Sequence, residues 1–268
     1  MRTTAIGMLL LSATFVSTVM CSPNAWADGD PTAPPGDWTI TGSAAVASQY
    51  RFRGISQSDN RPVVQGAITV QHASGFYVST WGSSASAEDS PVNIGGTEID
   101  VYGGYSKTLA GFTLDGGLYG YIYPGSEHAV GISESYYEVY GDVSKAYGPI
   151  TAKAGINFAP NQSYFKDFNT ATRHNVYVYG ELGFAPTSFP ISFHSHLGHT
   201  AGGFDYLVNK GVKQYLDYTV GATYKWKALA FDLSVVGTNL SKSDTSELDN
   251  DFHRAAKTVL VGSITASF

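Results

Sequence analysis

The sequence has almost no cysteine. Its single cysteine, Cys21, lies in an N-terminal stretch with the three parts of a signal peptide: a basic residue at Arg2, an apolar segment over residues 5–20 and a small-x-small cleavage motif that ends at Ala27. We therefore expect residues 1–27 to be a signal peptide that is removed. Without Cys21, the remaining chain has no thiol for disulfides, thiolate metal sites or thiol catalysis.

Long hydrophobic runs and basic residues are also scarce. After residue 27 no apolar stretch reaches the roughly 20 residues that a transmembrane helix needs. Lys and Arg number 16 against 22 Asp and Glu, which gives a net charge of −6. The chain therefore lacks the basic stripe by which proteins bind nucleic acid, and we expect no nucleic-acid partner. Glycine and tyrosine, in contrast, are abundant at 30 and 18 residues, which is typical of β-rich chains.

A regular alternation of short and long joins begins after a proline-rich leader, which we expect to be periplasmic, at residues 28–37. Strand-like runs are separated by short turns at residues 73–75, 108–111, 146–149, 185–190 and 225–228. Long polar loops fall at residues 54–61, 87–97, 124–133, 160–173, 201–213 and 239–254. These joins predict about 12 strands with all short turns at one end, as in membrane-spanning up-and-down barrels.

Apolar and polar residues alternate along the predicted strands with a period of two. If every apolar face points outward, that face has no charged residue at mid-strand. An uncharged outward face is what contact with lipid requires, because a cation at the bilayer midplane costs about 2–4 kcal/mol. Only the strand over residues 76–85 leaves its outward side undecided. Outward aromatic residues then gather at the strand ends as interfacial girdles, with Trp38, Tyr105, Phe112, Phe184, Trp226 and Phe268 at the short-turn rim and Phe52 and Phe158 at the opposite rim.

The last strand-like run ends on an aromatic residue, Phe268. This ending resembles the C-terminal signature that the barrel assembly machinery of outer membranes reads. A soluble β-sandwich is the alternative, but it would make the signal peptide, the loop pattern and the uncharged outer face coincidental. We therefore predict an all-β fold: a transmembrane up-and-down antiparallel β-barrel over residues 38–268, embedded in the lipid of the cell outer membrane.

The inward faces of these strands carry the ionisable residues. Face assignment makes the pore-lining candidates the acids Glu98, Asp100, Asp115, Glu138, Asp142, Glu181, Asp217 and Asp232 and the bases Arg51, Arg53, Lys153 and Lys225. Twelve strands give a backbone radius of about 12–13 Å, of which inward side chains occupy roughly half. A narrow pore with a weak cation preference is therefore predicted, and a lumen plugged by salt bridges is the alternative. Lumen tyrosines are expected to lie over strand glycines such as Gly104, Gly117 and Gly155.

One stretch, residues 50–59, is more specific than the strand pattern. It contains Tyr50, Arg51, Phe52, Arg53, Gly54, Ser56 and Gln57. Together with short motifs up to residue 140, it resembles the TorF family of porins, outer-membrane barrels of Gram-negative bacteria whose solute is undefined. The later half of the chain matches only in general pattern. The resemblance implies transport and supplies no catalytic residue or cofactor.

Two arginines in this stretch, Arg51 and Arg53, lie two positions apart and hence on one face of the expected first strand, residues 38–52. They are predicted either to form a cationic latch against Glu98 and Asp100 that narrows the mouth, or only to belong to a hairpin with paired charges.

Candidates for chemistry are weak. His194 and His196 share a lumen face with Ser192, but hydrolytic outer-membrane barrels place nucleophile and base at the outer lipid boundary. No third ligand completes a metal site, and the acidic loop over residues 241–251 lacks the spacing of a calcium loop. We expect no enzyme, metal or cofactor. The predicted function is passive diffusion of small hydrophilic solutes. A non-conducting barrel for adhesion or envelope structure through its long loops, and a barrel hydrolase, are the alternatives.

Overall fold

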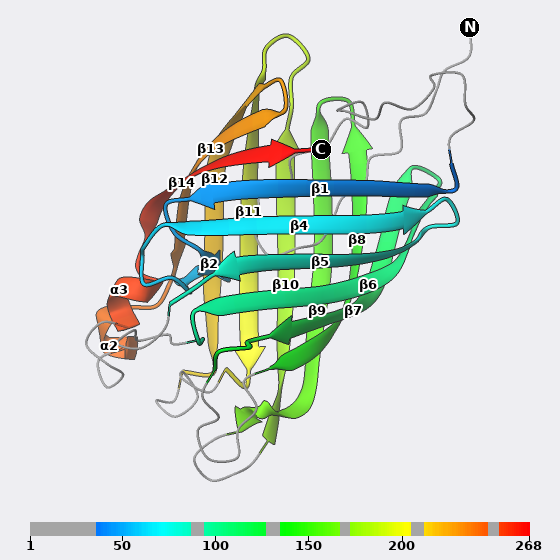
Figure 1. Ribbon diagram of the computed structural model, residues 1–268. Helices are drawn as coiled ribbons and strands as arrows, with labels where there is room; N and C mark the ends of the chain where they lie inside the picture. Colours follow the sequence, from blue (N-terminus) through cyan, green and yellow to red (C-terminus); the bar gives the residue numbers. More distant parts are fainter. Residues whose placement is uncertain (1–35, 87–93, 127–134, 167–171, 205–211, 246–251) are drawn as a thin grey trace, which may run out of the picture.

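The computed structural model describes residues 36–268 except 87–93, 127–134, 167–171, 205–211 and 246–251. The predicted signal peptide and most of the leader lie outside these residues and stay predictions. Twelve strands pair antiparallel, each with its neighbours in the chain, into a closed barrel (Figure 1). They are β1 Trp38–Ala47, β4 Val63–His72, β5 Phe76–Ser84, β6 Thr97–Leu109, β7 Phe112–Ile122, β8 Tyr136–Tyr147, β9 Ile150–Lys166, β10 Thr172–Phe184, β11 Ile191–Gly202, β12 Gln214–Trp226, β13 Leu229–Thr238 and β14 Val259–Ser267.

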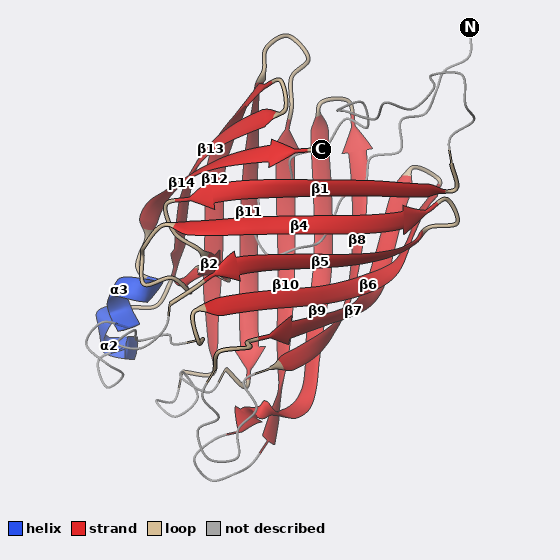
Figure 2. Cartoon of the chain, viewed as in Figure 1, coloured by secondary structure: helices blue, strands red, loops and turns tan. Residues whose placement is uncertain are grey.

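The joins alternate between short and long as predicted. The long join between β13 and β14 contains two short helices, α2 Lys242–Thr245 and α3 Phe252–Ala256, which lie at the long-loop end (Figure 2). The join predicted at residues 160–173 is shorter than expected, because β9 and β10 extend to Lys166 and Thr172. No helix in the described part of the chain is long and apolar enough to cross a membrane.

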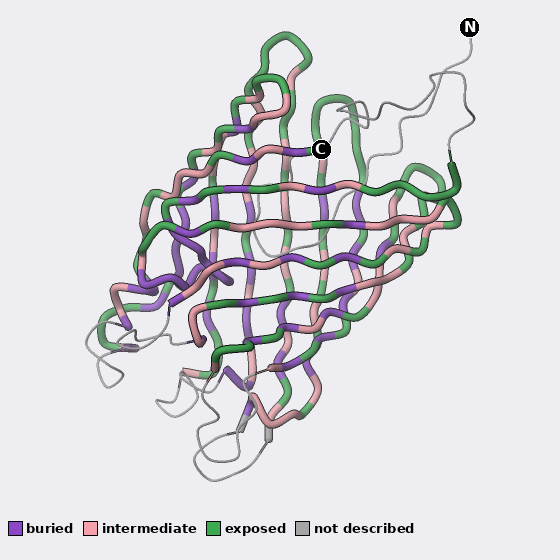
Figure 3. The backbone as a smooth tube through the Cα atoms, in the orientation of Figure 1, coloured by how far each residue is buried: buried purple, intermediate pink, exposed green. Residues whose placement is uncertain are grey.

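Exposure alternates along the strands, as the colouring in Figure 3 shows. β5 turns Phe76 and Val78 outward and buries Trp81, which settles the face that the sequence left open. In the described strands the charged Lys and Arg side chains on the outer face are Lys107 and Lys145, both beside short turns. The predicted girdle residues are exposed, namely Trp38, Tyr105, Phe112, Phe158, Phe184, Trp226 and Phe268. Phe52 is the exception: the prediction is wrong, because Phe52 is buried inside the barrel.

Glycines bring two strands close together on the inner wall at the β6–β7 pair. Gly104 pairs with Gly117, and the Tyr140 hydroxyl lies 2.8 Å from where a Cβ would stand at either position. The Tyr179 ring likewise covers Gly155. Tyrosines therefore lie over strand glycines as predicted, with the rings filling space that side chains would otherwise occupy.

Gly117→Ala is expected to lower the free energy of unfolding by about 1–3 kcal/mol, because the new methyl group would overlap backbone atoms of Gly103 and Gly104. The adjacent Gly116→Ala is the matched control, since its Cβ would stand 3.4 Å from the nearest atom, the Tyr140 carbonyl oxygen. Urea unfolding in detergent micelles compares the two. Equal midpoints would show that this close approach does not limit stability.

The wall strand β1 ends earlier than expected, and the chain turns into the barrel. Ala47 closes β1, and two short strands, β2 Arg51–Phe52 and β3 Ile55–Ser56, form a separate hairpin. Its two-residue turn has positive φ at both positions, 45° at Arg53 and 80° at Gly54, as type I′ turns require. Residues 49–59 are all buried. We call residues 49–59 the lumen hairpin, and its presence corrects the predicted strand over residues 38–52.

The barrel closes at a short seam. β1 pairs with β14 over five residues, from Ser43 to Ala47, whereas it pairs with β4 over ten. One further contact follows, in which the Ser48 amide donates to the Gly262 carbonyl at 2.8 Å. Beyond it the chain leaves the wall and enters the lumen hairpin.

Candidate functional site

The lumen hairpin extends from the β1 side of the barrel to the walls on the other side. Its turn residue Gly54 lies against β12 and β13, so that a Cβ there would stand 2.6 Å from Thr238 Cγ2 and 3.0 Å from Asp217 Cβ. The preceding residue, Arg53, reaches β8 and β10 instead. The hairpin thereby narrows the lumen from within.

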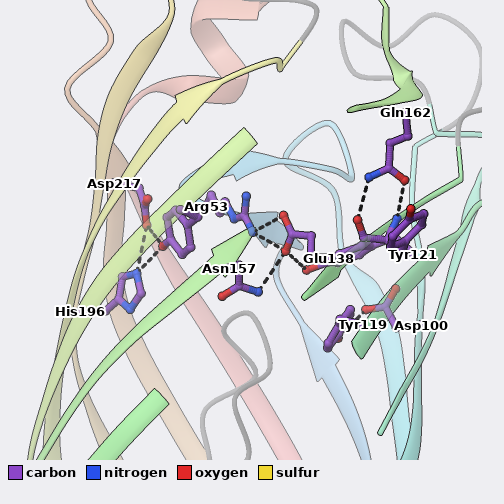
Figure 4. Close-up of polar contacts among 11 residues, drawn as sticks. Arg53, Asp100, Tyr119, Tyr121, Glu138, Asn157, Gln162, His196 and Asp217 are labelled. Carbon is purple, nitrogen blue, oxygen red and sulfur yellow. Dashed lines mark hydrogen bonds and ion pairs between the residues drawn. The ribbon is translucent and has the colours of Figure 1, made fainter. Parts of the chain in front are cut away.

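An ion pair between Arg53 and Glu138 of β8 holds the turn in place (Figure 4). Arg53 Nη2 donates to both carboxylate oxygens, at 2.8 and 2.7 Å. The Tyr121 hydroxyl and Asn157 Nδ2 donate to Glu138 Oε2 at 3.1 and 3.0 Å. Both charged side chains are almost fully buried, at 1% and 0% exposure. The Glu138 carboxylate therefore accepts hydrogen bonds from three side chains, whereas the buried Nε of Arg53 has no hydrogen-bond partner among the described residues.

Aromatic rings surround the Arg53 guanidinium. Its central carbon lies 4.1 Å from the Tyr177 ring centroid, 4.8 Å from that of Phe52 and 5.6 Å from that of Phe204. These distances are within the range of cation–π attraction, which is strongest when the cation is desolvated. Glu138, Tyr177 and Phe204, with Tyr121 and Asn157, therefore form a cation pocket that Arg53 fills. We keep this name, the cation pocket, for these five residues.

The outer end of the lumen hairpin is tied to α3 and the residue after it. Arg51 Nη1 donates to the carbonyl oxygens of Gly54 at 2.6 Å and Lys257 at 3.0 Å. Arg254 of α3 pairs with Asp59 at 2.7 Å. Burial lowers the pKa of Arg51 to about 10, so its guanidinium stays charged at neutral pH. The hairpin is thus held by β8 at its turn and by α3 and Lys257 at its other end.

The prediction that Arg51 and Arg53 form a latch against Glu98 and Asp100 is wrong, because neither arginine pairs with these acids in the described structure. Tyr50, not an arginine, contacts Glu98, with its hydroxyl 3.1 Å from Oε1, and the Tyr119 hydroxyl donates to Asp100 at 2.8 Å. Both acids are buried at about 1% exposure or less. Arg53 pairs with Glu138 instead, because the turn carries it across the lumen and away from β6. Of the two predictions for this stretch, the hairpin with a paired charge is the one confirmed.

A row of tyrosine rings in contact covers the inner wall from β6 to β8. Ring centroids lie 4.6 Å apart between Tyr102 and Tyr119, 4.6 Å between Tyr119 and Tyr121, and 4.4 Å between Tyr121 and Tyr136. Phe52 of the lumen hairpin packs edge-on against Tyr121 at 5.5 Å. The hairpin therefore covers this aromatic row.

A cavity of about 90 Å³ lies inside the barrel, bordered by the lumen hairpin and by wall strands on several sides, among them β1, β7, β10 and β14. Five of the predicted pore-lining residues border it: Arg51, Arg53, Glu181, Asp217 and Asp232. His196 lies between two of its acids, with Nδ1 3.3 Å from Glu181 Oε1 and Nε2 3.2 Å from Asp217 Oδ1. Asn157, Tyr121 and Tyr177 of the cation pocket border the same cavity, so the two spaces are continuous.

The remaining pore-lining candidates lie on the inner face but away from this cavity. Lys153 and Asp142 pair at 3.8 Å, Asp115 accepts from Tyr77 at 2.7 Å, and Lys225 is half-buried near a short turn. Glu98, Asp100 and Glu138 are the buried acids described above. The pore-lining role of all twelve stays a prediction.

The contacts of His194 with Ser234 and Asp232 differ from the order of groups in a hydrolytic triad. The Ser234 hydroxyl and the Asp232 carboxylate both approach His194 at Nε2, at 3.1 and 3.6 Å. In a catalytic triad the acid holds the other ring nitrogen, so that Nε2 is left for the nucleophile. His196 faces Glu181 at Nδ1, and its Nε2 lies 2.6 Å from the Tyr177 hydroxyl and 3.2 Å from Asp217 Oδ1. Among the described residues no group of His, Cys, Asp and Glu is arranged to bind a metal.

Comparison with other proteins places this geometry in a known fold. The porin NanC matches with a TM-score of 0.55 and 11% identity over 86% of this chain and 99% of that chain. The KdgM porin matches with a TM-score of 0.53 and 12% identity over 85% of this chain and 99% of that chain. KdgM in complex with disordered oligogalacturonate matches with a TM-score of 0.52 and 11% identity over 86% of this chain and 99% of that chain. This chain shares their barrel fold. No curated protein shows significant sequence similarity.

Sequence families give a direct assignment. The family profile described as "Bacterial protein of unknown function (Gcw_chp)" matches residues 31–268, a range that includes the whole of the described barrel. The chain with the twelve-stranded barrel and the lumen hairpin therefore belongs to the bacterial family Gcw_chp.

Proposed function

We propose that this protein is a passive diffusion channel for small hydrophilic solutes in the cell outer membrane, with a preference for cations and a kinship to the TorF porins. One observation carries the proposal: an apolar, aromatic-edged outer belt encloses a polar lumen that is narrowed by a hairpin rather than filled by the wall. Outer-membrane barrels that conduct have such a belt around a polar interior.

The charges of the cavity support cations over anions. Glu181, Asp217 and Asp232 border it together with Arg51, Arg53 and His196, and Arg53 is neutralised by Glu138. Rings of carboxylates favour cations in channels. KdgM has been crystallised with an oligogalacturonate, a polyanion. The acidic cavity of this chain favours solutes of the opposite charge.

The partners that we propose follow from the outer face. The apolar belt suits outer-membrane lipid. Phe268 projects at the short-turn end, and its amide donates to the Gly42 carbonyl at 3.0 Å, so the terminal aromatic is held beside β1. We propose that the barrel assembly machinery reads this residue before the seam closes.

Ion selectivity in planar bilayers tests the channel. Purified protein should produce discrete conductance steps, and a salt gradient should give a reversal potential that favours cations. The double variant Asp217→Asn with Asp232→Asn should lose most of this preference, because it removes two cavity carboxylates. Glu98→Gln is the matched control and should leave the reversal potential unchanged, since Glu98 is buried away from the cavity. Absence of any steps across a range of voltages would overturn the channel.

A further inference from the structure

We infer that the cation pocket is a recognition site for solutes that carry a guanidinium group, and that Arg53 occupies it as a built-in substitute for such a solute. This inference rests on the proposed channel function and specifies its substrate class. The structure assigns the chemistry directly, because the group bound there is a guanidinium. Glu138 accepts two hydrogen bonds from one side of it, and Tyr177 lies against its face.

The cation pocket suits the flat face of a guanidinium as well as its charge. A planar, delocalised cation stacks on aromatic rings, as Arg53 does on Tyr177, whereas an ammonium is a compact and strongly hydrated point charge. The charge is met by Glu138, whose two oxygens accept from the same nitrogen, Nη2. Tyr121 and Asn157 donate to Glu138 and so fix the carboxylate in place. The pocket therefore favours guanidinium over ammonium or sodium.

The position of Arg53 is an unfavourable one for arginine. It occupies the first residue of a type I′ turn with φ 45°, where Asn, Asp or Gly are preferred because they tolerate positive φ. A residue placed against its backbone preference indicates that the side chain has a specific task. Here that task is to fill the cation pocket.

A solute can reach the cation pocket from the cavity, because Tyr121, Asn157 and Tyr177 border both. A guanidinium that binds Glu138 must displace Arg53, since both use the same carboxylate oxygens. Displacement removes the ion pair that holds the turn of the lumen hairpin. The favoured solute would thus loosen the constriction that blocks its own passage.

Arg53→Ala empties the cation pocket and provides the test, with guanidinium chloride at millimolar concentration as the probe. We expect guanidinium to reduce the current through single Arg53→Ala channels at concentrations roughly tenfold lower than methylammonium, a gap that corresponds to cation–π and bidentate contacts in a desolvated site. Urea is the neutral control of the same shape and should have no effect. Arg53→Ala with Glu138→Gln should lose the block.

A second measurement does not depend on conduction. In detergent, millimolar guanidinium should raise the thermal midpoint of Arg53→Ala above that in equal sodium chloride, and should not do so for the wild type or for the Glu138→Gln double variant. Arg53→Lys, which keeps a positive charge, controls for loss of folding. Equal effects of guanidinium on Arg53→Ala and on the double variant would overturn the inference. Thermal stabilisation without any conductance would support the site and overturn the channel.

Discussion

Single-channel conductance should rise several-fold when Arg53 is replaced by alanine. Arg53 anchors the turn of the lumen hairpin, and both partners of its ion pair with Glu138 are buried. Removing one partner of a buried pair costs about 3–5 kcal/mol, because the other charge is left uncompensated. This cost falls on the inward position of the hairpin, so its inward population should drop by roughly two to four powers of ten relative to the displaced one. The measurement is conductance in planar bilayers.

Arg61→Ala is the matched control for Arg53→Ala. Arg61 is close by in the sequence and pairs with Asp59, but its side chain is 78% exposed, and exposed pairs contribute about 0–1 kcal/mol. Its conductance should equal that of the wild type. If Arg53→Ala also conducts like the wild type, the hairpin is not what limits flow.

Gly54→Ala should open the channel by a different route. The added methyl group would stand 2.6 Å from Thr238 Cγ2 and 2.7 Å from the Gly237 carbonyl oxygen, so the turn must withdraw from β12 and β13. Alanine also disfavours the φ of 80° at this position. We expect conductance close to that of Arg53→Ala, measured in the same bilayers.

Gly111→Ala separates the steric effect from backbone strain. Gly111 has φ 79°, nearly the same as Gly54, but a Cβ there would meet no atom within 4 Å. It should lower stability slightly and leave conductance unchanged. In the double variant of Arg53→Ala and Gly54→Ala the two increases should not add, because both release the same hairpin. Additive increases would indicate two independent constrictions.

The barrel wall was predictable because its rule is local. Strand residues alternate between lipid and lumen, so residues such as Leu118 and Tyr119 reveal their faces from the sequence alone. Where both faces carry aromatic residues, as in β5, the alternation gives no answer. There the pairing of Val78 with Val70 and Gly103 decides the outward face.

The site was only partly predictable, because its contacts join distant parts of the chain. Arg53 and Glu138 are 85 positions apart, and no strand pattern selects Glu138 over Glu98 or Asp100. One local signal was present: Arg53-Gly54 stands between two short strand-like pairs, and a Gly at the second turn position is typical of a two-residue hairpin. The alternation from β1 into residues 50–52 concealed it, because Phe52 fitted an outward rim position. Phe204 has no sequence signal of its own.

Because the seam between β1 and β14 is short, the lumen hairpin should also affect which pair of strands separates first when the barrel unfolds. β1 and β14 meet across 214 residues of chain at Ser48 and Gly262, so the seam has the largest loop-closure cost of any pairing in the wall. Five paired residues and the hydrogen bonds at Gly42 and Ser48 offset this cost. The hairpin follows β1, and its ties to Arg254 and Lys257 come just before β14. The hairpin therefore links the chain after β1 to the chain before β14 and stabilises the seam between them. When the hairpin is released, as in Arg53→Ala, β1 and β14 should separate before any other pair of neighbouring strands.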